Sequence, residues 1–591
     1  MNKKMTLHVI NTITLIALGS VMIWLSWNKW MDVWIDFGDD LFVQWKILKG
    51  AVLYKDIAYF RGPFSIYLNV ELLRLFGTGI NTLIFAQLFK IAALAFLTYR
   101  FFLETSGIIA AFMTSAVFLT LFAFPEYGVM GNFNFVCPYT YAIVDGFVLT
   151  MIGFYIFLQF IKKESLLLLF SLGIIGGTIF LTKVELFYAF CFAILSGFIL
   201  WRQYLRKSDQ IGFTKALIII LIGSIIPIGL FLIYFSVKMP WLQAMHALTL
   251  QYIPNPVFTK DAFYLQISGF DAPDFNITGI FIDVIEGLML VMLIAAIGYI
   301  LCKAKVKEFL NKFRVLFLIF FGFIFWAASY CLPISFLGRL FHPLPPVILI
   351  FLILGLRRIS KAKSAACHTV ILIVFSIFSF ILLIKIFLKA FIGGYGFVLA
   401  LPSIWILIVI MLDFMPKEVD SYLIGTRQNV RNLSLGLIVV LGLGFVYYSG
   451  FYYQIKVLKI GYGADKITSF SPQISGYGLQ FQKALDFVNA NLKANETFLV
   501  LPEGTLLNYL SRRDTGTHYF KIFFAEKDMW SDDAILQDFR QHPPDYILYK
   551  PCRGFGISYG PKILPWIWSD YKLIKIQKAY DQRDLFVVKR K

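Results

Sequence analysis

A short acidic segment near the amino terminus carries the residue types best suited to chemistry. Asp36, Asp39 and Asp40 place three carboxylates within five positions. In a helix, Asp36 and Asp40 would share one face at a spacing where like charges repel unless a cation, a substrate or a raised pKa compensates. Such clusters are typical of working sites, where a carboxylate serves as general base or binds a cation. The alternative interpretation is a solvated loop without a function.

A second acid and a cation follow in the same stretch. Asp56 and Arg61 precede Gly62 and Pro63, which we expect to bend the loop back to the membrane surface. A guanidinium binds phosphate oxygens bidentately, so Arg61 would suit an anionic phosphate ligand. Taken alone, the same arginine is equally typical of an anchor at a membrane interface.

Two further pairs of charged residues lie at the ends of apolar segments. Lys183 and Glu185 would either bind an anion or anchor a helix end through a local contact, and both interpretations are open. Arg339 and His342 lie before a run of prolines, and broken helices at membrane depth tend to line cavities. For His342 the favoured interpretation is an interfacial histidine with a local hydrogen bond.

The elements that must position these residues are long apolar helices. The chain is 59% hydrophobic, 18% aromatic and only 15% charged, which excludes an ordinary soluble globule. About 20 apolar residues cross a bilayer, and the sequence predicts a polytopic α-helical membrane protein with about thirteen spans. The predicted spans are 7–27, 79–99, 107–124, 141–161, 165–182, 186–201, 214–236, 281–302, 315–332, 343–356, 369–388, 396–413 and 433–450.

The distribution of basic residues predicts the orientation. Lysine and arginine gather in alternate short loops, such as 303–314 and 357–363, which should therefore be cytoplasmic together with the N-terminus. Under this assignment, the net charge of +19 reflects basic loops at the membrane surface and does not indicate binding of nucleic acid. It also leaves two large outward loops, 28–78 and 237–280, and an outward tail.

The chain changes character after the last predicted span, which predicts a transmembrane domain over 1–451 and an extracytoplasmic α/β domain over 452–591. Helical periodicity fits 479–493 and 532–541, and alternating apolar patterns predict strands at TFLVLP, DYILY, YKLIKIQ and LFVVKR. Within this tail, the PEG segment at 502–504 and the pair Arg512 and Arg513 are expected to be turn and helix-end residues, and contact with the acceptor or the membrane surface is the alternative.

The first outward loop also carries a family resemblance. The pattern DFGxxLxxxWxxxxGxVLYxDIAYFxGPxSxYLN, followed by LFG, within 34–77 resembles bacterial members of glycosyltransferase family 39, which are relatives of the dolichyl-phosphate-mannose protein mannosyltransferases. More distantly it is similar to the lipid A aminoarabinose transferases, in the membrane glycosyltransferase superfamily of the C type. Weaker matches are NFNFVCPYTY at 132–141, LTKVELF at 181–187, VLPEGTLLNYLSRR at 500–513 and HPPDYILY at 542–549.

The resemblance implies an inverting glycosyltransferase of the cell envelope, in a bacterial plasma (inner) membrane. It would move a hexose or pentose from a polyprenyl-phosphate donor to an acceptor hydroxyl outside, with an aspartate of the first loop as general base. Counted back from Gly50, Asp36 is closest to the usual base position and Asp40 is the second candidate, although here the adjacent acids are Asp39 and Asp40. The substrate-binding candidates are Asp39, Asp56, Arg61, Tyr139, Lys183, Glu185, Arg339 and His342.

The resemblance also indicates partners and leaves one cofactor open. Some members of the superfamily use a divalent metal ion near the acidic loop, and Asp36, Asp39 and Asp40 could hold one. The partners would be the bilayer, a polyprenyl-phosphate sugar and a glycan, lipid or protein acceptor, but no nucleic acid. The alternative function is a transporter or flippase for a lipid-linked or anionic solute, which should place ionisable residues at mid-membrane in repeated helices.

Overall fold

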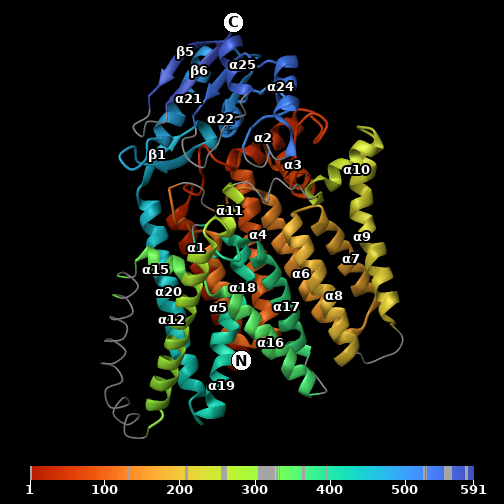
Figure 1. Cartoon of the computed structure of the whole chain (residues 1–591), viewed down its shortest axis with the longest axis vertical. Coiled ribbons are helices and arrows are strands. Elements are labelled where there is room, and N and C mark those ends of the chain that lie inside the picture. Colours follow the sequence, from red (N-terminus) through yellow and green to blue (C-terminus); the bar gives the residue numbers. More distant parts are fainter. Residues whose placement is uncertain are drawn as a thin grey trace.

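The protein is a bundle of long helices with a sheet-containing domain at one end (Figure 1). The computed structural model of the whole chain describes residues 3–129, 133–205, 211–253, 262–303, 327, 331, 333–362, 367–392, 394, 396–523, 526, 529–551, 562–578 and 584–591. The arrangement is that of a polytopic helical membrane protein with a C-terminal α/β domain, as the sequence predicts.

Among the described residues, ten helices are long and apolar enough to cross a membrane, and two shorter apolar helices, α5 (Ile108–Val117, continued by η1, Phe118–Ala123) and α7 (Leu166–Phe180), accompany them. They account for every predicted span except 315–332, which lies outside the described residues apart from 327 and 331. The ten spans are formed by α1 (Lys3–Ser26), α4 (Ile80–Ser106), α6 (Tyr141–Lys163), α8 (Val184–Tyr204), α9 (Phe213–Ser236), α12 (Pro273–Ile300), α16 (Leu344–Ala362), α17 (Cys367–Leu383), α18 (Leu401–Val409) with η6 (Ile410–Phe414) and α19 (Met415–Tyr422), and α20 (Arg427–Gln454).

These segments form helices because a chain in hydrocarbon must satisfy its backbone hydrogen bonds internally. Their outer faces carry exposed apolar side chains, such as Phe89 on α4 and Leu230 on α9. In α9 only 11% of the apolar window is buried within the protein. A helix that is apolar on all sides and covered on few of them is suited to lipid contact.

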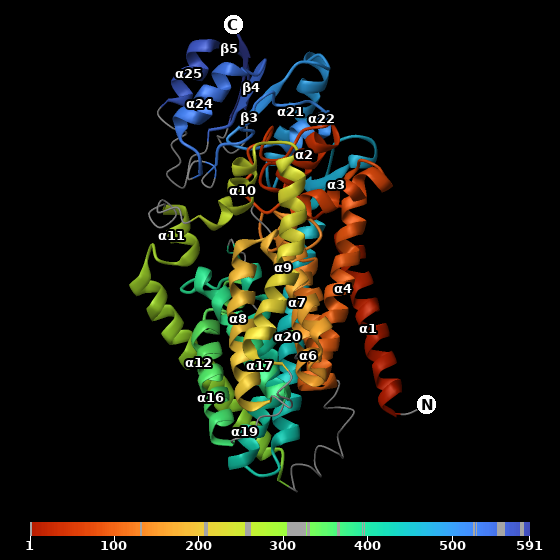
Figure 2. The same ribbon diagram turned by 90° about the vertical axis from the view of Figure 1, so that its right-hand side faces the viewer.

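The connecting segments at one end of the bundle form short helices of their own. These are α2 (Phe37–Leu48), α3 (Phe64–Phe76), α10 (Trp241–Thr249) and α11 (Ala262–Ser268). They lie near the C-terminal domain, at the opposite end from the N-terminus (Figures 1 and 2). The two large loops that the sequence assigns to one side of the membrane therefore meet the tail at the same end of the bundle.

The C-terminal domain begins two residues after α20. Its main sheet has the strand order β3-β4-β6-β5, with β3 (Phe498–Leu501) parallel to β4 (Tyr546–Tyr549). The other two strands, β5 (Tyr571–Gln577) and β6 (Leu585–Arg590), pair in antiparallel fashion. The remaining elements are the pair β1 (Lys456–Ile460) and β2 (Ile467–Phe470), with α21 (Tyr477–Asn491), α22 (Leu506–Ser511), α24 (Asp532–Gln541) and α25 (Ile563–Asp570).

The burial of the strands follows from their sequences. The strands β3 and β4 are buried at every residue, as expected of apolar runs in a parallel pair. At the edge of the sheet, β5 is exposed over its five central residues, which include Lys572 and Lys575. Lysines on an edge strand discourage pairing with another chain.

The tail is fixed to the first loop by a close approach of two helices. A Cβ atom added to Gly38 in α2 would lie 2.2 Å from the backbone nitrogen of Leu506 in α22. Nearby, Trp34 donates from Nε1 to the carbonyl of Tyr477 at 3.0 Å. Only glycine permits such backbone contact, so the sequence of the first turn of α2 determines where the tail docks.

The junction between α20 and the tail contains a buried ion pair. Lys456 and Glu126 are almost fully inaccessible, and Lys456 also donates to the carbonyl of Lys29 at 2.6 Å. The backbone N–H of Glu126 donates to Ser449 Oγ at 3.2 Å. These contacts join the ends of three spans to the first strand of the C-terminal domain.

We predict that Gly38→Ala weakens the docking of the C-terminal domain. The added methyl group meets backbone atoms, which cannot rotate away, so overpacking should lower the free energy of unfolding by about 1–3 kcal/mol. Thermal unfolding in detergent and limited proteolysis of the tail measure the effect. The control is Gly442→Ala in α20, where a Cβ meets nothing within 4 Å. Equal stability of the two variants would contradict this view of the contact.

Candidate active site

The first loop directs its three acids into different surroundings. The helix α2 begins at Phe37, so Asp36 precedes it while Asp39 and Asp40 lie in its first turn. Asp39 contacts side chains of the C-terminal domain, whereas Asp40 contacts the first loop and the start of α6. The structure thus groups Asp36 with Asp39 and not with Asp40, unlike the shared face that a helix over 36–40 would have produced.

Asp36 occupies a strained turn. Its backbone has φ 58° and ψ −57°, and the N–H of Phe37 donates to the carbonyl of Ile35 at 2.6 Å. This is a γ-turn with a left-handed central residue, a conformation that costs about 1–3 kcal/mol outside glycine. Asp36 is half-buried, whereas Asp39 and Asp40 are buried. Strain of this kind at an accessible carboxylate points to a functional site.

A buried lysine from the C-terminal domain lies among the acids that face the tail. Lys521 is ion-paired with Asp39, and its Nζ lies 3.7 Å from both Glu503 and Glu526. Thr505 donates to the other oxygen of Asp39 at 2.7 Å. Burial alone would lower the pKa of Lys521, but the surrounding carboxylates outweigh it and raise this pKa well above its ordinary value.

The two glutamates beside Lys521 are more easily protonated than ordinary ones. Burial raises the pKa of Glu503 well above its usual range and also raises that of Glu526, while Lys521 opposes both shifts. In the described part of the chain, Oε2 of each glutamate accepts no hydrogen bond. The sequence predicts a turn residue at Glu503, and the structure places it in the acidic site instead. Its position directly after a buried strand was the available signal.

Both carboxylate oxygens of Asp40 accept hydrogen bonds. Tyr59 donates its hydroxyl to Oδ1 at 3.0 Å, and the backbone N–H of Tyr141 donates to Oδ2 at the same distance. Arg61 lies 4.0 Å from Oδ1. Burial raises the pKa of Asp40, although Arg61 and the two hydrogen bonds oppose the shift. The position of Asp40 suits a residue that orients Tyr59 and Arg61.

The turn after Arg61 fixes this arginine against the break between α7 and α8. A Cβ on Gly62 would lie 2.2 Å from the carbonyl oxygen of Leu181. The N–H of Gly62 donates to Thr182 at 3.3 Å, and the N–H of Phe64 donates to Leu181 at 3.1 Å. Glycine at position 62 therefore allows the first loop to bring Arg61 beside the residues that begin α8.

Lys183 is the first of those residues and completes a basic cluster, which we define as Arg61, Lys183 and Lys385. The Nζ of Lys183 lies 5.6 Å from the ring centre of Tyr139 and 3.9 Å from Glu185. Glu185 is also ion-paired with Lys385. Burial lowers the pKa of Lys183 to about 8, with Lys385 and Arg61 acting in the same direction and Glu185 opposing. Four sequence-predicted residues, Arg61, Tyr139, Lys183 and Glu185, thus meet here, with Asp40 beside Arg61.

Three other predicted residues lie elsewhere. Asp56 is exposed, and its carboxylate accepts a hydrogen bond from the N–H of Val52 at 2.7 Å, which stabilises a turn. Arg339, at the end of α15 (Ile334–Arg339), is ion-paired with Asp283 of α12, and His342 Nδ1 lies 3.0 Å from the same carboxylate. Asp283 is a buried partner of both residues, and its position within an apolar helix gave no sequence signal for this contact.

Three carboxylates that face the C-terminal domain are close enough to one another to hold a cation. Among the described residues, one oxygen each of Asp36, Asp39 and Glu503 lies within 4.8 Å of the others. Asp40, which the sequence analysis included in a possible metal set, is turned away toward Tyr59 and Tyr141. The ammonium of Lys521, however, already contacts Asp39 and lies near Glu503.

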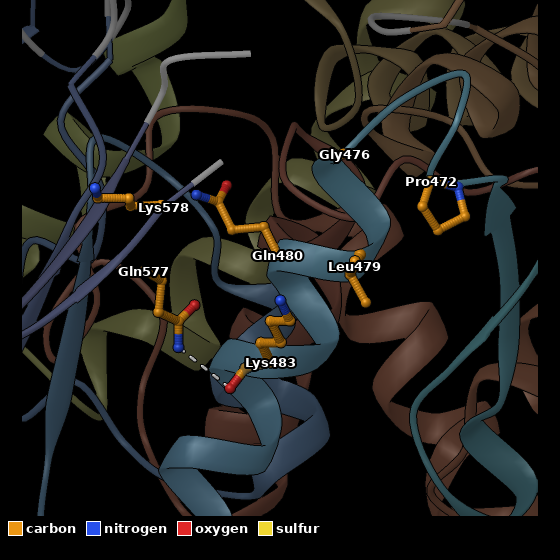
Figure 3. A pocket seen from close by; sticks show the side chains of 7 residues that line it. All are labelled: Pro472, Gly476, Leu479, Gln480, Lys483, Gln577 and Lys578. Atoms are coloured by element: carbon orange, nitrogen blue, oxygen red, sulfur yellow. Dashed lines mark hydrogen bonds between the residues drawn. The ribbon is translucent and has the colours of Figure 1, made fainter. Parts of the chain in front are cut away.

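A separate pocket lies inside the C-terminal domain, between α21 and the end of β5 (Figure 3). Gln577 donates from Nε2 to the carbonyl of Lys483 at 3.2 Å across it. None of its lining residues is acidic, and none belongs to the acidic site or to the basic cluster. The lining residues are Pro472, Gly476, Leu479, Gln480, Lys483, Gln577 and Lys578.

Comparison with known proteins gave matches among solved structures alone. No protein-family model matches the chain, and no curated protein does. The chain is similar to an oligosaccharyltransferase from Archaeoglobus fulgidus in complex with zinc and sulfate, with 12% identity and a TM-score of 0.49 over 91% of this chain and 67% of that chain. The same enzyme tethered to an acceptor peptide gives 11% identity and a TM-score of 0.48 over 91% and 69% of the two chains.

A second protein matches over almost its whole length. ArnT from Cupriavidus metallidurans, bound to undecaprenyl phosphate, is 11% identical with a TM-score of 0.45, and the match covers 98% of this chain and 97% of that chain.

Proposed function

We propose that this protein is an integral-membrane glycosyltransferase that moves a sugar from a polyprenyl-phosphate donor to an acceptor hydroxyl. The observation that carries the proposal is that a strained, half-buried carboxylate and a cluster of three basic residues lie together at one end of the bundle. Tyr139 lies near both: burial raises its pKa well above the ordinary value, Glu185 and Asp36 add to the shift and Arg61 opposes it, and Lys183 lies over its ring. The resemblance of the first loop to family 39 supports the same assignment.

The first part of the reaction is removal of a proton from the acceptor. Asp36 accepts the proton of the incoming acceptor hydroxyl while the hydroxyl oxygen forms a bond to C1 of the sugar. A positioned general base contributes about 10²–10⁴-fold in rate. A single displacement through an oxocarbenium-like transition state inverts the anomeric configuration. Asp36 suits this role better than Asp40, because Asp36 is half-buried whereas Asp40 is buried and out of reach of an incoming acceptor.

The second part is departure of the phosphate. As the bond between C1 and the phosphate oxygen breaks, its electron pair stays on the polyprenyl phosphate, and negative charge develops there. Arg61 and Lys183, whose side chains are largely shielded from solvent, and the more exposed Lys385 form a basic cluster that would stabilise this charge. Glu185 lies within ion-pair distance of both lysines and holds them beside each other.

The side of the membrane follows from the charge of the loops. The site and the C-terminal domain lie at the same end of the bundle, opposite the N-terminus (Figure 1). The basic loops predict that the N-terminal end is cytoplasmic, so we place the reaction on the outer face of the plasma membrane. A lipid-linked donor agrees with this side, because its sugar is presented at the membrane surface.

A transporter receives less support from the same structure. Its hallmark would be ionisable residues within the spans, and Lys90 of α4 and Asp145 of α6 are such a pair. Their charged atoms lie 2.6 Å apart, and both side chains are largely buried. Each therefore neutralises the other, as in a contact that fixes two helices together.

We predict that Asp36→Asn lowers sugar transfer by about 10²–10⁴-fold, because the amide cannot accept the proton. The assay measures transfer of labelled hexoses and pentoses from polyprenyl phosphate in membranes. Asp36→Gly should lose activity equally but unfold at higher temperature, since glycine relieves the γ-turn strain of about 1–3 kcal/mol. The matched control is Glu71→Gln, an exposed acid on α3. Full activity in Asp36→Asn would exclude this base.

We also predict an alkaline limb in the pH dependence of kcat/KM near pH 8. Burial lowers the pKa of Lys183 from 10.5 to about 8, so the cation that binds phosphate is present below pH 8 and is lost above it. The rate should then fall tenfold per pH unit. In Lys183→Arg the charge persists, and the limb should move above pH 10. A wild-type profile that stays flat to pH 10 would contradict the role of Lys183.

A further inference from the structure

The ammonium group of Lys521 lies where a divalent cation would have to bind. The candidate ligands Asp36, Asp39 and Glu503 offer oxygens within 4.8 Å of one another. Lys521 is ion-paired with Asp39 and lies 3.7 Å from Glu503 and from Glu526. Its ammonium group therefore contacts one candidate ligand, Asp39, and approaches a second, Glu503. It also approaches Glu526, which is not one of the three candidate ligands.

A divalent ion does not fit this arrangement. Calcium and magnesium need ligand oxygens at about 2.0–2.6 Å and several of them at once. An ion held by Asp39 and Glu503 at such distances would lie next to the ammonium of Lys521. Like charges in a buried site repel strongly because the medium screens them little. The lysine and the metal are therefore mutually exclusive occupants.

Lys521 is also not free to move away. Its side chain is only 4% exposed, so it has no path to solvent while the tail is docked. The next residue, Ile522, donates its N–H to the carbonyl of Pro502 at 2.8 Å. The preceding residue, Phe520, packs its ring 5.7 Å from that of Phe42 in α2. Neighbours on both sides hold the lysine between the first loop and the C-terminal domain.

The chain supplies this cation from far away in the sequence. Asp39 and Lys521 are separated by 482 positions, and they meet only because α2 and α22 are in contact. Removal of the ammonium would leave Asp39, Glu503 and Glu526 without the cation that they share. Three buried carboxyl groups would then favour either protons or a metal ion.

We propose that Lys521 is the resident cation of the acidic site, a positioning residue of the C-terminal domain that takes the place of a divalent metal and keeps Asp39 and Asp36 in position. The effect on catalysis rests on the proposed function, whereas the effect on metal binding does not. It follows that the reaction proceeds without a divalent ion. It also follows that the docked tail forms part of the active site.

The first experiment measures Mn²⁺ binding to the purified full-length protein by electron paramagnetic resonance. We expect no tightly bound Mn²⁺ in the wild type and one bound ion in Lys521→Met, lost again in Lys521→Met combined with Asp39→Asn. The control is Lys562→Met, which removes an exposed lysine paired with Asp533 in the same domain. Tight binding of Mn²⁺ to the wild type, or no gain in Lys521→Met, would overturn the proposal.

The second experiment measures sugar transfer in the presence of EDTA and then of added Mn²⁺ or Mg²⁺. We expect the wild type to be insensitive to both treatments, and Lys521→Met to lose about 10–100-fold, as is typical when a positioning partner is removed. Added Mn²⁺ should restore part of the activity of Lys521→Met, and Lys521→Arg should retain more than Lys521→Met. Loss of wild-type transfer in EDTA with recovery in Mn²⁺ would overturn the proposal.

The two experiments separate this inference from the function on which it rests. If no sugar is transferred by any variant, the proposed function fails, and Mn²⁺ binding still decides whether Lys521 excludes a metal. If Lys521→Met does not fold, Mn²⁺ binding by the wild-type protein alone tests the inference. Bound Mn²⁺ in the wild type refutes the inference, and its absence at concentrations that saturate ordinary carboxylate sites supports it.

Discussion

The contact between the first loop and the C-terminal domain is the constraint on which the rest of the site depends. Gly38 lets the backbone of α2 approach that of α22, and this approach brings Thr505 and Lys521 to Asp39. Docking buries Asp39 and at the same time supplies Lys521 as the counter-charge that a buried carboxylate requires. Packing at a single glycine and charge balance at a single aspartate therefore support each other.

Charge balance continues from the tail into the bundle. Asp39 is balanced by Lys521 on one side of α2, and Asp40 is balanced by Arg61 on the other. Both acids come from the first turn of the same helix, so its orientation sets the acidic site and the basic cluster together. Asp36, at the strained turn before α2, is half-buried, unlike the buried Asp39 and Asp40. The proposed base and one member of the basic cluster, Arg61, thus come from one short segment, whereas Lys183 and Lys385 come from elsewhere in the chain.

Much of the architecture could be predicted from local patterns. Apolar runs of about 20 residues form the spans because hydrocarbon leaves the backbone no other partners, and strands such as β3 and β4 are short apolar runs between turns. Short elements in polar or mixed sequence, such as α2, α22 and β1, had no such signal. For the residues of the first loop, local spacing suggested that Asp36 pairs with Asp40, whereas docking of the tail groups Asp36 with Asp39.

The sequence by itself determined that the chain crosses a membrane many times, that the acids of the first loop and Arg61 are candidates for chemistry, and that a small α/β domain follows. These properties depend on composition and on neighbours within a few residues. Only the tertiary structure decided which charges face each other. The partners of Asp39, Asp40 and Arg61 lie tens to hundreds of positions away, and electrostatic pairing in a buried site depends on distance in space, which local spacing does not encode.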